Sequence, residues 1–256
     1  MPYSKKRKYS RRRTYKSRKT YKRPKLSKNF RKAVKTIMTR ACETKAIQFP
    51  SQVQNCNNNI TNTSVFNIIP AISQGTSQST RIGNKISPVY FTLRLSLTCL
   101  NIINIYALAS PTYFDIYIFK WKSTNEAGGA PTAGDMNRFL QDNATGQSYN
   151  GELMDGLRPL NADQFTLLVK KRCTLSNFNA VNSTSGIFQQ TNPNKTFYFN
   201  LTKHLKKVWI YDDNGTQVEN DNFYIAVAST QTDGQSTGTS VTGNWQYISD
   251  LRFKDA

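Results

Sequence analysis

A strict alternation of apolar and polar residues between positions 89 and 99 limits the folds open to this chain more than any other feature. The apolar positions are Val89, Phe91, Leu93, Leu95, Leu97 and Cys99, and the positions between them hold Tyr90, Thr92, Arg94, Ser96 and Thr98. Successive side chains of a strand point to opposite faces of a sheet. The segment therefore predicts a β-strand with one face in the core and the other in water.

Seven other segments after residue 43 show the same period or are dense in β-branched and aromatic residues, which predicts further strands. The full expected set is 44–50, 63–69, 86–100, 113–122, 164–174, 196–203, 222–230 and 241–253. The segment 113–122 is apolar on both faces, so it is expected to be a central strand or one that a neighbouring subunit covers.

The connections between these strands are long and polar, and the longest, 123–163, is expected to hold one short helix at 135–141. Such connections do not fit a meander of tight hairpins. They favour an all-β fold, a single eight-stranded jelly-roll sandwich in which the chain repeatedly crosses between two sheets. Long loops in a compact domain are usually functional, here as subunit contacts or an outer surface.

Positive charge is concentrated at the N-terminus. Residues 1–40 contain eighteen Lys and Arg and no Asp or Glu, whereas residues 41–256 contain 17 basic and 15 acidic residues. Unpaired charge at this density repels itself, so an arm over 1–40 is expected to be largely disordered and residues 41–256 to form the folded domain.

The arm contains residue types that bind nucleic acid. Lys and Arg neutralise phosphates, and tyrosine rings stack on unpaired bases. The candidate binding residues are Lys5, Lys6, Arg7, Lys8, Arg11, Arg12, Arg13, Lys16, Arg18, Lys19, Lys22, Arg23, Tyr9, Tyr15 and Tyr21. The combination suits a single strand better than a membrane surface, which would call for Trp, Leu or Phe on one face. The alternative is a generic basic tail with chance tyrosines.

Two basic clusters within the arm also fit a nuclear localisation signal. They consist of Lys5, Lys6, Arg7 and Lys8, followed by Arg11, Arg12 and Arg13. The basic N-terminus lacks the apolar core of a signal peptide, and no apolar run reaches the length of a membrane span, so membrane insertion is not expected.

The base of the arm, 27–40, changes character. Phe30, Val34, Ile37 and Met38 fall on one helical face, and Ser27 is placed to cap the helix. The segment predicts a short basic amphipathic helix that docks on the domain; the alternative is disorder until it binds.

Chemistry that would indicate an enzyme is missing from the sequence. GxSxG, HExxH, GxGxxG and the P-loop do not occur. His204 is the only histidine, and the four cysteines are scattered without a CxxC pair, so no metal and no cofactor are expected. The segment 212–215 is interpreted as a turn rather than a calcium loop. Two basic groups, 170–172 and Lys203 with Lys206 and Lys207, either face nucleic acid or are ordinary solvated charge.

The segment Gly75-Thr76-Ser77-Gln78-Ser79-Thr80-Arg81-Ile82-Gly83-Asn84-Lys85-Ile86 resembles the "G…R.G.KI" stretch that precedes a long strand in capsid proteins of small circular single-stranded DNA viruses, the circovirus-like (CRESS-DNA) group. The whole chain is similar to those proteins in layout, with a basic arm followed by a jelly roll. The resemblance implies an icosahedral shell of sixty copies (T=1), with the arm on a single-stranded circular DNA genome inside the virion.

The resemblance also implies partners and a location. The expected partners are other copies of the chain, the DNA genome, host nuclear import receptors and a cell-surface attachment factor whose identity the sequence does not indicate. Assembly is expected in the host cell nucleus. In the order of the family's strands, 44–50 is the first, 241–253 is the eighth, and the longest loop joins the fourth to the fifth.

Three other interpretations fit the same features. One is the coat protein of a small single-stranded RNA virus or satellite virus. The second is a non-viral β-sandwich that binds nucleic acid as a monomer or dimer. The third is a lectin-like sandwich with a chance basic tail.

Overall fold

The computed structural model describes residues 27–41, 43–100, 111–122, 130–142, 146–175, 179–181, 188–190, 193–231 and 241–255. The chain divides into two compact units, 1–41 and 42–256. Each unit is described by itself.

The described part of the first unit is helix α1 (Lys28–Ala41), which confirms the helix expected over 27–40. The Ser27 Oγ accepts a hydrogen bond from the Phe30 amide at 3.1 Å, so Ser27 caps the helix as expected. Phe30 and Val34, on the predicted apolar face, are 53% and 37% exposed.

All eight expected strands are present, with bounds that differ from the expectation by a few residues at most. They are β1 (Thr44–Pro50), β3 (Val65–Asn67), β4 (Lys85–Cys99), β5 (Thr112–Trp121), β6 (Phe165–Leu175), β9 (Asn194–Asn200), β11 (Tyr224–Gln231) and β12 (Gly243–Asp255). Four short strands were not expected, namely β2 (Gln54–Cys56), β7 (Asn179–Val181), β8 (Phe188–Gln190) and β10 (Trp209–Ile210). Segments this short do not hold enough residues to show a period.

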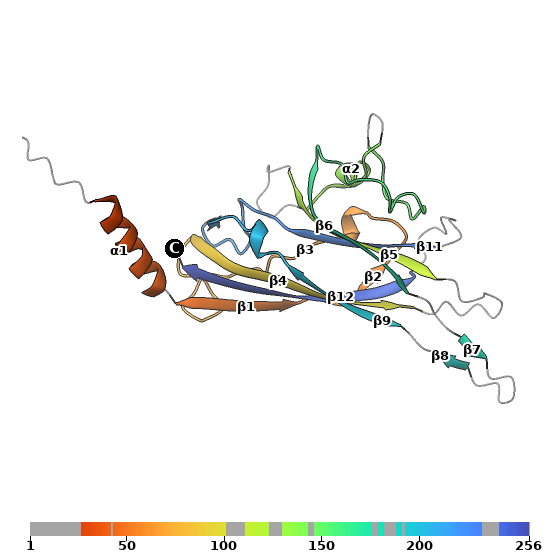
Figure 1. The fold of residues 1–256 in the computed structure, drawn as a ribbon, viewed down its shortest axis with the longest axis horizontal. Helices are drawn as coiled ribbons and strands as arrows, with labels where there is room; N and C mark the ends of the chain where they lie inside the picture. The colour runs from red at the N-terminus through yellow and green to blue at the C-terminus, as the bar shows by residue number, and fades with distance from the viewer. Residues whose placement is uncertain are drawn as a thin grey trace, which may run out of the picture. The chain divides into compact units, whose positions relative to one another are not determined.

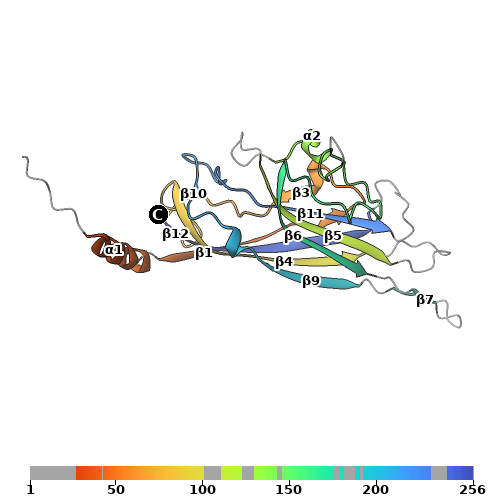
Figure 2. The same cartoon turned by 45° about the horizontal axis from the view of Figure 1, so that its top comes forward.

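The strands form two main sheets that lie face to face (Figures 1 and 2). One sheet has the order β1-β12-β4-β10, with β9 also paired to β4 and β2 to β12. The other has the order β3-β11-β5-β6. The strands β7 and β8 pair with each other in a separate ribbon.

The pairing identifies the fold as a jelly roll. Among the eight expected strands taken in chain order, the first pairs with the eighth, the second with the seventh, the third with the sixth and the fourth with the fifth, all antiparallel. A long antiparallel hairpin rolled over itself produces this set of pairs. The expected fold class is therefore confirmed.

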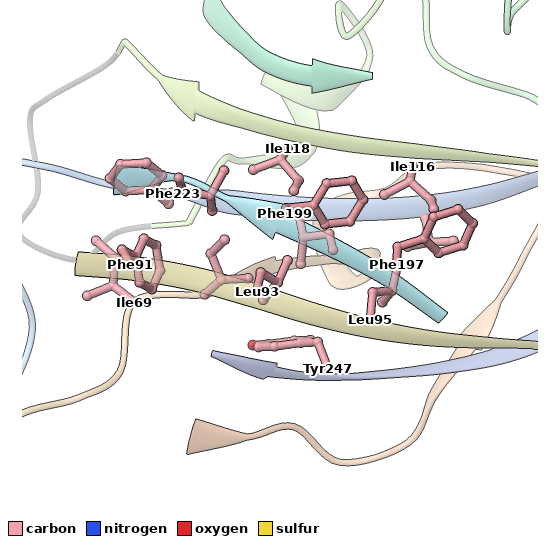
Figure 3. Packing of buried hydrophobic residues seen from close by; sticks show 14 of the residues in the cluster. Ile69, Phe91, Leu93, Leu95, Ile116, Ile118, Phe197, Phe199, Phe223 and Tyr247 are labelled. Carbon is pink, nitrogen blue, oxygen red and sulfur yellow. The ribbon is translucent and has the colours of Figure 1, made fainter. Parts of the chain in front are cut away.

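The main core lies between the two sheets (Figure 3). Phe91, Leu93 and Leu95 project from β4 toward the other sheet, where Ile116 and Ile118 lie on β5. All five side chains have no exposed surface. From Phe91 onward, the alternation that predicted β4 thus selects the face that is buried between the sheets, whereas Val89, expected on the same face, is 48% exposed.

A second core covers the opposite face of the β3-β11-β5-β6 sheet. Tyr117 and Phe119, the alternate side chains of β5, pack there against Phe139 and Phe165. Phe139 belongs to the long connection between β5 and β6, which also holds helix α2 (Ala133–Met136) and lies over this sheet in Figure 1. The strand that is apolar on both faces is therefore central, and the chain itself covers it. Helix α2 begins and ends earlier than the expected 135–141.

Two short 3₁₀ helices complete the described elements. They are η1 (Asn62–Ser64), which leads into β3, and η2 (Thr202–His204), which follows β9.

Candidate nucleic-acid interface

The predicted arm residues, from Lys5 to Arg23 with Tyr9, Tyr15 and Tyr21, lie outside the described residues, as do both predicted nuclear localisation clusters. The assignment of these residues therefore stays a prediction. The described residues nearest to them are in helix α1, where Lys28 and Arg31 are exposed and the first turn holds no acidic residue. This part of the unit offers only positive charge to a polyanion.

The basic group at 170–172 is divided by the strand that carries it. Lys170 and Arg172 lie opposite Tyr117 and Asp115 in the β5–β6 ladder, on the face that the long connection covers. Lys171 points the other way and is exposed. Lys170 and Arg172 are thus engaged in internal contacts, and the interpretation of 170–172 as a nucleic-acid surface stays a prediction.

Arg172 forms a bidentate ion pair with a buried carboxylate. Its Nε and Nη2 donate to Asp115 Oδ1 and Oδ2, both at 2.7 Å, and Asp115 has no exposed surface. The Tyr149 hydroxyl donates to the same Oδ2 at 2.8 Å and lies 2.8 Å from Thr230 Oγ1. Burial, with the Asp115 charge, raises the pKa of Tyr149 well above its ordinary value, so its hydroxyl keeps the proton that it donates.

Lys170 is also held internally. Its Nζ donates to the Arg158 carbonyl at 2.9 Å and lies 5.3 Å from the centroid of the Tyr117 ring. Burial lowers the pKa of Lys170, as expected for an ammonium group that loses water. This lysine links the long connection to the sheet below it.

The lysines of the second basic group are all exposed. Lys203, Lys206 and Lys207 lie at the surface, and the Lys206 Nζ also donates to the Asn220 carbonyl. His204 between them is only partly exposed, and burial, together with the charges of Lys203 and Lys120, lowers its pKa. The group therefore offers three exposed lysines.

The segment 212–215 is a turn, as expected. The Gly215 amide donates to the Asp212 carbonyl at 3.0 Å, and Asn214 has a φ of 64°, in the region that Asn tolerates. The carbonyls of Asp212 and Gly215 accept hydrogen bonds from Arg81 at 3.2 and 2.6 Å. The guanidinium thus binds two backbone carbonyl oxygens of this turn. Within the described residues, no group of three or more His, Cys, Asp or Glu is arranged to hold a metal.

Arg81 is the buried residue of the segment 75–86 whose side chain makes the most hydrogen bonds with the surrounding loops. The guanidinium has no exposed surface, donates to the Gly83 carbonyl and Asn84 Oδ1, and lies 4.6 Å from the centroid of the Tyr211 ring. It therefore ties the start of β4 to the turn that follows β10. In the sequence this arginine stands out only as part of a motif, and no pattern there indicates its burial.

A pocket of about 220 Å³ lies between residues 59–62, helix α2 and residues 148–150. Its lining is made of amide, hydroxyl and apolar groups, without a charged side chain. It offers no cation for a phosphate.

The remaining predictions concern thiols and membranes. Cys56, Cys99 and Cys173 are buried, and Cys42 lies outside the described residues. No helix in the described ranges is long and apolar enough to cross a membrane.

The described geometry thus defines a class: an all-β jelly roll whose chain also carries a strongly basic N-terminal segment. Comparison with models of known protein families found no match, and comparison with curated proteins found none either. Solved structures gave weak likenesses. One is described as Desmodium yellow mottle tymovirus, with 10% identity, coverage of 99% of this chain and 96% of that chain, and a TM-score of 0.35.

Two further likenesses are weaker still in overall superposition. The mavirus penton protein has 10% identity, covers 84% of this chain and 100% of its own, and has a TM-score of 0.22. The 60-mer BFDV capsid protein has 13% identity, covers 84% and 95%, and has a TM-score of 0.19. At these values the likenesses assign no family, and the jelly roll stands on the strand pairing described above.

Proposed function

We propose that this chain is a viral capsid protein that assembles into an icosahedral shell and packages single-stranded circular DNA through residues 1–40. The observation that carries the proposal is the separation of charge from fold. Residues 1–40 contain eighteen basic residues, and the jelly roll that follows them is close to neutral. The arm thus has the composition to bind a polyanion, and the domain has the structure to hold many arms together.

Exposed apolar side chains on the long connection support contact between copies. Leu153, Met154 and Leu157 lie within one turn and are 39%, 56% and 66% exposed. Grouped apolar side chains on a protein surface are typical of protein–protein contacts. In the proposal they lie at an interface of a shell of sixty copies.

The charge count is compatible with a genome as cargo. Sixty arms of eighteen charges supply on the order of 1,000 positive charges, which neutralise about as many phosphates. An extended arm of forty residues spans roughly 130 Å, enough to enter the interior of a small shell.

The proposal is tested on the purified full chain by electron microscopy and by analysis of cargo. We expect round shells of megadalton mass whose released nucleic acid is degraded by DNase and not by RNase. Cargo that only RNase degrades would support an RNA virus coat protein instead. A monomer or dimer in light scattering would contradict the capsid role.

Deletion of residues 2–40 tests the role of the arm. We expect the truncated chain to lose its cargo and keep its folded domain. Packaging of the normal cargo by the truncated chain would contradict the proposal.

Assembly in the nucleus, through host import receptors, is part of the same proposal because the basic clusters at 5–8 and 11–13 match the composition of an import signal. A fluorescent protein fused to residues 1–25 should accumulate in nuclei. An unchanged cytoplasmic signal would remove the nuclear step and leave the capsid role in place.

A further inference from the structure

The outer face of the sheet that contains β4 carries a cluster of arginine and tyrosine side chains, which we call the Arg-Tyr face: Tyr90, Arg94, Tyr198 and Arg252. The strand register brings them together from three strands. Arg94 on β4 lies directly opposite Tyr198 on β9, and Tyr90 on β4 lies opposite Arg252 on β12. All four alternate with core residues of their strands, so they project away from the sandwich.

The two tyrosines hold each other in place. Their hydroxyl oxygens are 2.9 Å apart, within hydrogen-bond distance. The guanidinium carbon of Arg252 lies 5.3 Å from the centroid of the Tyr90 ring. Tyr198 is nevertheless 58% exposed. An aromatic ring fixed at its hydroxyl and open to solvent is a ready stacking surface.

The charge of this face is positive. Arg94 and Arg252 are exposed, whereas Asp250, which shares the face through its place in the β12 alternation, is only 7% exposed. In the described parts of β1, β4, β9 and β12, Asp250 is the one carboxylate that alternates onto this side. Solvent thus meets two guanidinium groups beside an exposed ring.

We infer that the Arg-Tyr face binds single-stranded nucleic acid, with a base stacked on Tyr198 and adjacent phosphates on Arg94 and Arg252. The inference rests on the proposed function and extends it from the arm to the folded domain. Exposed rings beside cations bind single strands without regard to sequence, because every base has a face that stacks. No hydrogen-bonding side chain need be aimed at a base edge.

The charge pattern selects this occupant over another part of the chain. Residues 1–40 contain no acidic residue, so the arm is repelled by Arg94 and Arg252 unless a polyanion lies between them. An apolar partner surface would have to bury two guanidinium groups without pairing them, which is costly. A nucleic acid strand neutralises the face and also the arm.

The test uses the full chain, freed of nucleic acid at high salt, with a short oligothymidylate that contains 4-thiothymidine. After irradiation, cross-linked peptides are identified by mass spectrometry. We expect cross-links on peptides that contain Tyr90 or Tyr198, besides those in the arm. Cross-links confined to residues 1–40 would overturn the inference and leave the proposed packaging role intact.

Variants separate the two kinds of contact. Arg94→Gln with Arg252→Gln should lower the slope of log affinity against log salt by about 1.4, since each phosphate contact with a single strand contributes about 0.7. Tyr198→Ala should weaken binding roughly fivefold or more, and Tyr198→Phe, which keeps the ring, much less. If the slope of log affinity against log salt is unchanged in the double arginine variant, the inferred phosphate contacts of Arg94 and Arg252 are wrong.

A charge-matched control distinguishes local binding from loss of net charge. Lys171→Gln with Lys207→Gln removes two exposed cations elsewhere on the domain. This control should leave the cross-links at Tyr90 and Tyr198 in place. Arg94→Gln with Arg252→Gln should abolish the same cross-links. Equal losses in both double variants would show a general charge effect and overturn the site. Thermal unfolding of each variant verifies that the domain is intact.

Discussion

At the scale of residues, the best-defined feature is the buried cluster of Asp115, Tyr149, Arg172 and Thr230. A buried carboxylate is tolerated only when its charge is paired and its oxygens are hydrogen-bonded. Here the guanidinium satisfies both oxygens and the tyrosine hydroxyl adds a third donor. The cluster therefore joins β5 and β6 to the long connection above them.

Gly156 is required by this ion pair. A Cβ at position 156 would lie 1.2 Å from Arg172 Nη2 and 2.4 Å from Asp115 Oδ2. We expect Gly156→Ala to displace the guanidinium and to lower the free energy of unfolding by about 3 kcal/mol, because the buried carboxylate loses its partner. Chemical denaturation measures the difference.

Gly83→Ala is the matched control for this substitution. A Cβ at position 83 would meet no atom within 4 Å. It should change the free energy of unfolding by less than about 1 kcal/mol, as is usual for a substitution that disturbs no contact. Equal effects at both positions would mean that close approach to Arg172 is not the reason for glycine at 156.

At the scale of elements, β5 is the strand with two apolar faces. From the sequence, either a central position or cover by a neighbouring subunit is expected. In the structure the strand is central, between β11 and β6. Its second face is covered by residues of the same chain, with the Phe139 ring 5.3 Å from Tyr117 and 5.4 Å from Phe119. The long connection is therefore part of the hydrophobic core and also a surface loop.

Phe139→Ala should loosen this connection from the sheet. The ring is fully buried, and removing a buried phenylalanine side chain typically costs 3–5 kcal/mol. Hydrogen exchange should show faster exchange over 130–165 than in the wild-type chain, while β4 and β12, which pack in the other core, change less. Uniformly faster exchange across both sheets would contradict two separable cores.

At the scale of the whole molecule, the proposed shell requires surfaces that bring copies together. The exposed group Leu153, Met154 and Leu157 is the candidate contact. Met154→Glu with Leu157→Glu should prevent assembly, because a charge buried at an apolar interface is unpaired. Light scattering should show subunits in place of particles.

The same experiment needs a control for added charge and for folding. Gln141→Glu adds a carboxylate at another exposed position of the long connection and should leave assembly unchanged. The double variant should keep the unfolding transition of the wild-type chain, since both side chains are exposed. Normal particles from the double variant would exclude this group as a contact and leave the role of the arm untouched.

The all-β class, the eight expected strands and the helix at the base of the arm can be predicted from the sequence alone. These follow from short-range patterns. The alternation over 91–99 predicts which side of β4 is buried, and Ser27 before an apolar helical face predicts where α1 begins. The concentration of charge before residue 41 is likewise visible without a fold.

How distant segments meet is visible only in the folded structure. Tyr90 and Arg94 were placed on the wet face by their alternation, but Tyr198 and Arg252 join them through pairings that span more than a hundred residues. The same is true of Arg172 with Asp115 and of Arg81 with the turn at 212–215. A local period fixes the face of a side chain, whereas the partner across the sheet depends on register and on which loop packs above it.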